Sequence, residues 1–241
     1  MDLFVVTGTT NGIGAALKAA LSDRANTVLV CLSRAPESAD IPRNVHIDFA
    51  DVKSIEVAFR NVEGALDEIR FDRAVLINNA GIAQPVARFD GQNALDLANN
   101  LAVNVVAPML LTSCFANALR HRATSRVVVN ISSGAAKRPI AGWSAYCTSK
   151  AALEMATRVA ALEAEPGLSI CSLAPGVVDT PMQAVVRSSD PVAFPDRPKF
   201  EAMKNEGALR PAADVARDIL AAIDQGKLTN GGNFDLREMT A

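Results

Sequence analysis

The sequence is short of the residues from which metal sites and disulfide frameworks are built. Its 241 residues include only four cysteines and two histidines. Cys31, Cys114, Cys147 and Cys171 lie far apart with no CxxC pair, so neither zinc-type spacing nor a disulfide framework is present. We therefore predict no metal site. Three of the cysteines lie in apolar or helical segments and are predicted to be small buried side chains. For Cys147, beside Tyr146, we also expect packing, since no resolving thiol or base is nearby in sequence.

The sequence also lacks an excess of charge of either sign and long apolar runs. The formal net charge is −2, and no block of like charge occurs, so the sequence does not favour nucleic acid or an anionic membrane as a partner. The segment Met1–Val6 is too short and too acidic for a signal peptide, and no uncharged apolar run is expected to span a membrane. These absences predict a cytoplasmic protein.

What the sequence has is a regular alternation of strand and helix patterns, with 49% hydrophobic residues to fill a core. Strands are expected at Leu3–Thr7, Thr27–Leu32, Asn44–Ile47, Ala74–Ile77, Arg126–Ile131, Leu168–Leu173 and near Asn233–Leu236. Helices are expected from Ile13, over Ile55–Ile69, over about 95–121, from near Ala145, and over Val215–Ile223. This alternation predicts a single α/β domain over residues 1–241, doubly wound and Rossmann-type, with a parallel sheet of about seven strands and helices on both faces.

One region lacks a regular pattern. Thr180–Arg210 contains Pro181, Pro191, Pro195 and Pro198. A long loop inside a compact domain is usually functional, so we predict a substrate lid over roughly 180–210. A disordered insertion is the alternative, although Phe194 and Phe200 favour some packing.

A glycine-rich turn joins the first strand to the first helix. It reads Thr7-Gly8-Thr9-Thr10-Asn11-Gly12-Ile13-Gly14. Glycine allows a sharp turn and close approach of a pyrophosphate, and the helix N-terminus offers unpaired N–H groups to that anion. A tight turn without a ligand is the alternative, but the position at the first strand–helix junction favours a dinucleotide site. The predicted contacts are Gly8, Thr10, Asn11, Gly12, Ile13 and Gly14.

The spacing of this turn is TGxxxGxG, and here the sequence resembles the short-chain dehydrogenase/reductase family. That family also carries an Asn-Asn-Ala-Gly segment after its fourth strand, which stands here as Asn78-Asn79-Ala80-Gly81. The resemblance implies that Asn79, Ala80 and Gly81 border the cofactor. After the sixth strand, Pro175 and Gly176 resemble the family's PG motif. The resemblance implies that the Val178 backbone and the Thr180 hydroxyl hold the nicotinamide carboxamide.

The end of the second strand bears on the choice of cofactor. NAD-specific sites place an acid there to accept from the ribose 2′-OH, whereas this chain has Ser33 and Arg34. An arginine fork suits a 2′-phosphate, so we predict NADP(H) rather than NAD(H). Glu37 and Asn11 argue against this, since Glu37 could fold back and relatives that prefer NADP often carry a base at position 11.

Two further features lie near the adenosine end of the predicted site. Asp48 matches the family's adenine-contacting aspartate, although it could equally be a capping or surface acid. Only ten residues, Ala35–Asn44, connect strands two and three, where the family has a helix and parallel strands normally need a dozen or more. We expect a short turn there, with room for one helical turn, and this departure weakens the cofactor prediction.

Candidate catalytic residues follow the fifth strand. A free tyrosine, with a pKa near 10, is a poor acid at neutral pH, but an adjacent cation lowers that pKa. Tyr146 is the single tyrosine of the chain, and Lys150 lies four residues later on the same helix face. Ser133 lies just past strand five, where open α/β sheets bind ligands, and could stabilise charge on a substrate oxygen. Ser132 competes for this role, and family spacing to the tyrosine selects Ser133.

Asn104 is a polar residue within an apolar helical stripe. One interpretation is a buried amide with satisfied hydrogen bonds. The family resemblance instead implies a fourth catalytic residue, which holds a water that relays protons through Lys150. The resemblance also implies that Lys150 and Tyr146 contact the nicotinamide ribose.

Within the family, several segments resemble the sepiapterin reductase and benzil reductase branch, which reduces vicinal dicarbonyls. They are Gly142–Cys147, Asp179–Gln183, Gly207–Leu209, Ala213–Ala216 and Gly232–Asp235. On this resemblance Trp143, Met182 and Asp235 are candidate substrate contacts. Asp235 aligns with the acid that anchors a pterin ring, although a surface acid at a strand end is an equal alternative.

These observations predict an NADP(H)-dependent reductase of a ketone or vicinal dicarbonyl, a small-molecule carbonyl substrate. Two alternatives stay open: an NAD-linked alcohol dehydrogenase of the same family, and a dinucleotide-sensing protein without catalysis. The second should lack the tyrosine or the lysine, which this chain keeps. Ala-rich faces on helices 95–121 and 145–165 predict a homodimer or homotetramer.

Overall fold

A seven-stranded sheet forms the centre of the computed structural model, which describes residues 1–40, 42–66 and 69–239. The strand order is β3-β2-β1-β4-β5-β6-β9, and every pairing is parallel. The strands are β1 Asp2–Thr7, β2 Thr27–Ser33, β3 Arg43–His46, β4 Phe71–Asn78, β5 Ala123–Ile131, β6 Leu168–Ala174 and β9 Asn233–Asp235. The order reverses direction between β1 and β4, as in doubly wound Rossmann-type folds, and confirms the predicted fold class.

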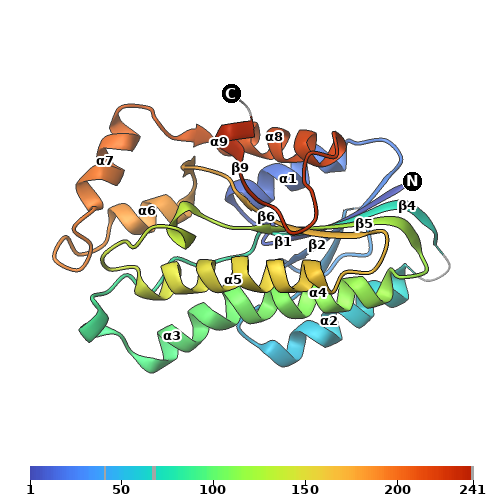
Figure 1. The fold of residues 1–241 in the computed structure, drawn as a ribbon, viewed down its shortest axis with the longest axis horizontal. Coiled ribbons are helices and arrows are strands. Elements are labelled where there is room, and N and C mark those ends of the chain that lie inside the picture. The colour runs from blue at the N-terminus through green and yellow to red at the C-terminus, as the bar shows by residue number, and fades with distance from the viewer. Residues whose placement is uncertain (41, 67–68, 240–241) are drawn as a thin grey trace.

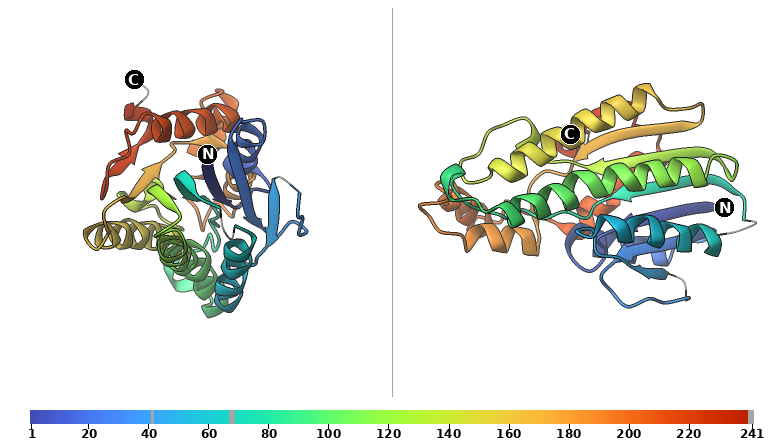
Figure 2. Two further views of the ribbon diagram at one scale, coloured as in Figure 1. Left: turned by 90° about the vertical axis from the view of Figure 1, so that its right-hand side faces the viewer. Right: turned by 90° about the horizontal axis from the view of Figure 1, so that it is seen from below.

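Helices cover both faces of the sheet (Figure 1, Figure 2). On one face lie α1 (Gly12–Ser22) and α8 (Ala212–Asp224); on the other lie α2 (Val52–Ala65), α4 (Ala107–Ala118) and α5 (Ser144–Leu162). Successive strand side chains point to opposite faces, so β1 divides its residues between two buried cores. Leu3 and Val5 pack toward α2 and α4, whereas Phe4 and Val6 pack toward α1 and α8.

The helical stretch before β5 is interrupted by one wide turn. It consists of α3 (Ala94–Leu101), a π-helical turn at Ala102–Val106, and α4. By length and composition alone, Ala94–Ala118 could cross a membrane, which the sequence analysis did not expect. Core helices pass the same test, and this one packs against α2 and α5 with Asn100 and Asn104 fully buried.

The region expected as an irregular lid is largely helical, so this prediction is wrong for its secondary structure. It holds α6 (Pro181–Arg187) and α7 (Arg197–Asn205), framed by a small parallel pair of β7 (Val178–Asp179) and β8 (Arg210–Pro211). Two of the prolines that indicated a loop occupy the first turns of α6 and α7, where a missing N–H costs nothing. Phe194 and Phe200 are buried, which confirms their predicted packing.

Smaller differences concern element ends. The connection from β2 to β3 has no helix among its described residues, only an isolated bridge from Ser38 to Asn44, which confirms a short turn; residue 41 lies outside the described part. The helix expected to reach Ile69 ends at Ala65, and residues 67 and 68 are likewise outside it. The last strand ends at Asp235 because α9 (Leu236–Met239) begins there. Short 3-10 turns lie at η1 Phe89–Gly91 and η3 Gly134–Ala136.

Candidate active site

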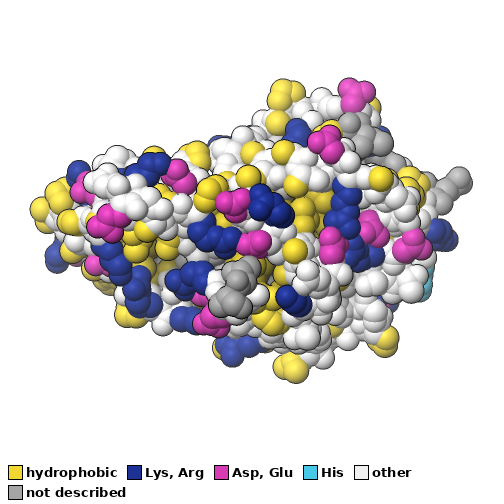
Figure 3. All heavy atoms as spheres, turned by 90° about the horizontal axis from the view of Figure 1, so that it is seen from above, with side chains coloured by type: hydrophobic (Ala, Val, Ile, Leu, Met, Phe, Trp, Pro, Cys, Tyr) yellow, Lys and Arg dark blue, Asp and Glu magenta, His cyan; other side chains and the backbone are white. Residues whose placement is uncertain are grey.

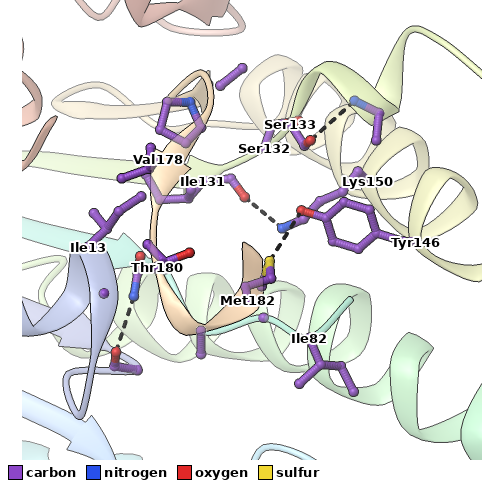
Figure 4. A pocket seen from close by; sticks show the side chains of 18 of the residues that line it. Ile13, Ile82, Ile131, Ser132, Ser133, Tyr146, Lys150, Val178, Thr180 and Met182 are labelled. Carbon is purple, nitrogen blue, oxygen red and sulfur yellow. Dashed lines mark hydrogen bonds between the residues drawn. The ribbon is translucent and has the colours of Figure 1, made fainter. Parts of the chain in front are cut away.

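A cavity of about 630 Å³ lies at the carboxyl ends of the central strands. This is where open α/β sheets bind ligands, and the volume is typical of a small-molecule site. Its walls come from the turns after β1, β4, β5 and β6 together with α6 and α7 (Figure 4). Predicted cofactor residues on these walls are Gly8, Thr10, Asn11, Gly12, Ile13, Ser33, Arg34, Asp48, Asn79, Ala80, Gly81, Tyr146, Lys150, Pro175, Gly176, Val178 and Thr180.

The glycine turn is packed so tightly that side chains would not fit. A Cβ on Gly8, whose φ is +71°, would lie 2.8 Å from the Ala80 Cα. A Cβ on Gly14 would lie 2.1 Å from the Gly8 carbonyl oxygen, so Gly14 serves close packing and does not line the cavity. Gly12 and Ile13 begin α1 on the cavity wall, and the Asn11 side chain caps none of its N–H groups. This cradle fits the phosphates of a dinucleotide.

Hydrogen bonds hold the turn after β1 against the turn after β4. The Thr7 hydroxyl accepts from the backbone N–H groups of Asn79 and Ala80, each at 2.9 Å. The Asn79 side chain donates back to the Thr7 carbonyl at 2.9 Å. Thr7 belongs to the glycine-rich turn and Asn79 to the Asn-Asn-Ala-Gly segment, so these bonds join the two motifs into one wall of the cavity.

At the other end of the cavity, Arg34 is exposed and forms no ion pair with any described carboxylate. The neighbouring Ser33 is buried, and its hydroxyl accepts from the Ala35 N–H at 3.2 Å. Asp48 lines the cavity and also accepts from the Ala50 N–H at 3.0 Å. The same side chain therefore caps a turn and faces the cavity. Glu37 is not among the described residues of the wall.

Ser133, Tyr146 and Lys150 come together at the inner part of the cavity. Tyr146 and Lys150 lie on the first turns of α5, and Ser133 precedes η3, where its hydroxyl accepts from the Ala135 N–H at 3.2 Å. Figure 4 shows the Lys150 ammonium directed at the Ile131 carbonyl, 2.8 Å away, and the Tyr146 hydroxyl directed at Met182. Ser132 instead donates to the buried Glu154 at 2.7 Å.

Burial governs the protonation of this group. Desolvation raises the pKa of Tyr146, and hydrogen bonding with Ser133 opposes it only in part. Desolvation also lowers the pKa of Lys150 to about 8. The sequence predicts that Lys150 lowers the pKa of Tyr146. Lys150 is not among the groups that set the raised pKa of this phenol; its ammonium lies 5.8 Å from the ring centroid and donates to the Ile131 carbonyl.

Asn104 lies behind the wall, in the π-helical turn. Its Oδ1 accepts from the Ile82 N–H at 2.9 Å, and its Nδ2 donates to the Ile82 carbonyl at 2.8 Å and to the Ser149 hydroxyl at 3.2 Å. The amide is fully buried and satisfied. A Cβ added to Gly81 would touch both the Asn104 Oδ1 and the Lys150 Nζ, at 3.0 and 3.6 Å, so both side chains lie close to that glycine.

The candidate substrate residues form an apolar end of the cavity. The Trp143 ring is 5.0 Å from those of Tyr146 and Phe194 and 5.5 Å from that of Phe200, by centroid distance. Met182, on α6, points its sulfur at the Tyr146 hydroxyl (Figure 4). These contacts join α5 to the α6–α7 segment and leave an aromatic surface beside the tyrosine.

Asp235 reaches the cavity from the end of β9, but both of its oxygens are engaged by Arg237. The hydrogen bonds from Arg237 lower the pKa of this carboxyl.

On the outer face over α1, α8 and α9, basic and acidic side chains are interspersed (Figure 3). No cluster of three or more metal-ligating side chains occurs among the described residues.

Sequence reasoning missed several residues of the wall. They are Lys137, Arg138, Ile140, Gln183, Val186, Phe200, Arg237 and Glu238. Most belong to no motif and reach the cavity only through the packing of α6, α7 and α9. The sequence did offer a signal for Arg237, which stands two residues after the strand-end acid Asp235.

The comparisons with known proteins agree with this geometry. The model of the short chain dehydrogenase family matches residues 2–191. A benzil reductase ((S)-benzoin forming) of Bacillus subtilis is 33% identical over 242 residues, which cover 99% of each chain. A sepiapterin reductase of Meriones unguiculatus is 32% identical over 251 residues, with 96% of this chain and 94% of the relative covered.

A solved structure from Beutenbergia cavernae that contains NADP at low occupancy superposes with a TM-score of 0.77. It is 26% identical and covers 98% of this chain and 94% of that one. The family match covers residues 2–191, which include most of the segments that line the cavity. The chain therefore belongs to the short-chain dehydrogenase/reductase family of oxidoreductases, in a branch shared with benzil reductase and sepiapterin reductase.

Proposed function

We propose that this protein is an NADP(H)-dependent reductase that converts a ketone or vicinal dicarbonyl into the corresponding alcohol. The observation that carries the proposal is the single cavity shared by Ser133, Tyr146, Lys150 and the glycine turn. The similarity to benzil reductase and sepiapterin reductase supports a carbonyl substrate.

In the proposed reaction each residue has a defined task. When bound, reduced nicotinamide supplies the hydride to the carbonyl carbon. Tyr146 gives its hydroxyl proton to the carbonyl oxygen, and Ser133 stabilises the charge on that oxygen by a hydrogen bond. Burial keeps the Tyr146 phenol protonated, as a donor must be, and Lys150 supplies a buried cation beside it. Asn104 holds the backbone at Ile82, from which a water could reach Lys150.

The cofactor proposal assigns the remaining walls. Gly8, Gly12 and Ile13 would hold the pyrophosphate, and Ser33 with the unpaired Arg34 would hold the 2′-phosphate. Asp48 would accept from the adenine amino group. The backbone of Val178 and the hydroxyl of Thr180 would orient the nicotinamide carboxamide. In the competing NAD-linked alcohol dehydrogenase, Arg34 would add nothing to cofactor affinity, because NAD has no 2′-phosphate.

The apolar end of the cavity favours an aromatic dicarbonyl within this class. Trp143 and Phe200 line this end, and Met182 lies beside the Tyr146 hydroxyl. Arg237 donates to both oxygens of Asp235, the acid that would anchor a pterin ring, so a pterin would compete with this ion pair. We therefore propose an aryl-substituted diketone as a better substrate than a pterin.

One experiment tests substrate and cofactor together. Oxidation of NADPH and NADH is followed with a panel of diketones, pterins and ketosteroids, for the wild type and for Arg34→Ala. We expect turnover of a diketone with NADPH, and a roughly 10- to 100-fold loss of kcat/KM for NADPH alone in the variant, as expected for one charge-assisted contact. Arg60→Ala, on the exposed face of α2, is the control. Equal use of NADH and NADPH by the wild type would support the NAD-linked alternative, and no turnover with any carbonyl would refute the reductase.

The proposal includes a homodimer or homotetramer built on the outer surface of α4 and α5. Met109, Met155, Val159 and Leu162 are apolar and 46–88% exposed there. Patches of this kind usually mark association surfaces.

We also propose a cytoplasmic location, which the four free cysteines support, because thiols persist in a reducing compartment.

A further inference from the structure

One buried acid beneath the cavity has no part in the reaction proposed above. Glu154 lies on α5, one turn after Lys150, and only 8% of its surface is exposed. Among the described residues, no lysine or arginine lies within ion-pair distance of it. Burying a carboxylate without a cation is costly, and such local conflicts are expected where function requires them.

The two carboxylate oxygens of Glu154 have different partners. One accepts from the Ser132 hydroxyl at 2.7 Å, and the other accepts from the Asn233 amide at 3.2 Å. Ser132 is the residue before Ser133 at the end of β5. Asn233 opens β9, the edge strand that leads to Asp235 on the cavity wall. A carboxylate accepts at both oxygens, so it can serve both donors at once.

The place of these bonds along α5 gives them a consequence. Tyr146, Lys150 and Glu154 are spaced by four residues and lie along one side of the helix. Lys150 bonds to the carbonyl of Ile131 and Glu154 bonds to the next side chain, Ser132. The strand end that carries Ser133 is therefore attached to the tyrosine helix at two successive residues.

We infer that Glu154 is a positioning residue, which sets the place of Ser133 relative to Tyr146 by holding Ser132 and the start of β9 against α5. It touches neither substrate nor cofactor. Its effect on turnover rests on the proposed function, in which Ser133 and Tyr146 act on the same carbonyl oxygen. Its effect on the position of Ser133 does not depend on that function. A misplacement of about 1 Å at a reacting group can cost about 100-fold in rate.

The single tyrosine of the chain allows the geometry to be read without turnover. Protein labelled with ¹³C at the tyrosine ring Cζ gives one resonance, whose position follows the hydrogen bonding of Tyr146 at neutral pH. Ser133 and Cys147 lie close enough to affect this phenol, Met182 accepts from its hydroxyl, and Lys150 lies beside its ring. Movement of Ser133 should therefore shift the resonance while these other groups stay in place.

The test compares Glu154→Leu and Glu154→Gln with the wild type. In Glu154→Leu we expect the tyrosine resonance to move and kcat to fall about 10- to 100-fold, with KM and NADPH affinity within about threefold. Glu154→Gln should restore both, because the Asn233 Oδ1 has no partner and can accept from the new amide after a half-turn of its side chain. Thr157→Val is the matched control. It removes buried hydrogen bonds to Asn130 and Ser172 from the next turn of α5 without touching Ser132.

The outcomes separate this inference from the proposed function. An unmoved resonance in Glu154→Leu, or a shift of equal size in Thr157→Val, would overturn the positioning role. If Glu154→Leu does not fold, Ser132→Ala removes the same hydrogen bond from the other side and must shift the resonance in the same direction. If the wild type reduces no carbonyl, the proposed function fails, while the resonance still decides the role of Glu154.

Discussion

At the scale of single residues, burial shifts the pKa values of two neighbouring ionisable groups in opposite directions. Desolvation raises the pKa of the Tyr146 phenol and lowers that of the Lys150 ammonium to about 8. At pH 7 the phenol is therefore neutral and the lysine is mostly protonated. This pairing suits a group that must give a proton before it can accept one.

Removal of the phenol tests this assignment. In Tyr146→Phe we expect turnover to fall by at least about 100- to 10,000-fold, the range for loss of a general acid, while NADPH affinity changes little. Steady-state kinetics and a binding titration measure the two effects. Cys147→Ala, at the adjacent position with a half-buried thiol, is the control and should keep its activity. Substantial residual turnover in the phenylalanine variant would assign the proton donor to another group.

At the scale of elements, the fit of the α6–α7 segment on α5 shapes the substrate end of the cavity. Gly142, just before α5, has a φ of +83°, and a Cβ there would lie 2.2 Å from the Ala193 carbonyl oxygen. Beyond this contact, Trp143 packs against Phe194 and Phe200. The approach of the two segments therefore depends on a residue without a side chain.

Gly142→Ala should displace the α6–α7 segment. We expect KM for the carbonyl substrate to rise several-fold and the melting temperature to fall, because left-handed backbone costs about 1–2 kcal/mol in a residue with a Cβ and the contact adds more. The affinity for NADPH should stay unchanged. Gly207→Ala has a similar φ of +66° and open space around its Cβ position, so it isolates the backbone cost. Equal KM values in the two variants would contradict the role of the contact.

The elements also show what the sequence could and could not predict. The strand–helix alternation was enough for the sheet, because buried parallel strands are continuous apolar runs and the motifs lie at their ends. The motif residues were brought to one cavity for the same reason. The α6–α7 helices were missed because Pro181 and Pro198 have the same signature at a helix start as in a loop. The bond between Glu154 and Ser132 joins residues 22 positions apart, and no local pattern reports it.

At the scale of the whole molecule, the amino end of the sheet is held together by an ion cluster. Asp224, at the end of α8, accepts from Arg24 beyond α1 and from Arg73 on β4, at 2.9–3.0 Å. Asp2 on β1 also accepts from Arg73. The cluster joins β1 and β4 to the ends of α1 and α8 on the side opposite the cavity.

This cluster predicts part of the acid sensitivity. Burial raises the pKa of Asp224, but hydrogen bonds from Arg24 and Arg73 outweigh it, so the pKa lies below its ordinary value of 3.8. Its contribution is therefore complete above pH 3.8 and is lost as the pH falls through the lower folded value. In urea unfolding, Asp224→Asn should cost up to about 1 kcal/mol at pH 7 and less as this carboxyl protonates. Glu56→Gln, in an exposed pair, should cost nothing measurable. A cost that does not change with pH would contradict this account.

The exposed apolar surface of α5 predicts association. Leu162→Glu places a charge on the most exposed apolar residue of this helix, at 88%, and we expect it to shift a dimer or tetramer toward the monomer. Sedimentation at micromolar concentration measures the shift. Val192→Glu changes an apolar residue of 70% exposure on the far segment and should leave the assembly intact. A wild type that sediments as a monomer would refute the assembly itself.

The short final helix α9 has a practical consequence for anyone who handles this protein. Asp235, Arg237 and Glu238 form part of the cavity wall, whereas the first residues of β1 lie at the opposite end of the sheet (Figure 1). A purification tag or fluorescent fusion at the carboxyl terminus would follow α9, whose Arg237 and Glu238 line the cavity, and would crowd what binds there. Immobilisation and labelling therefore belong at the amino terminus, and kinetics from carboxyl-terminal fusions should be compared with those of the untagged chain.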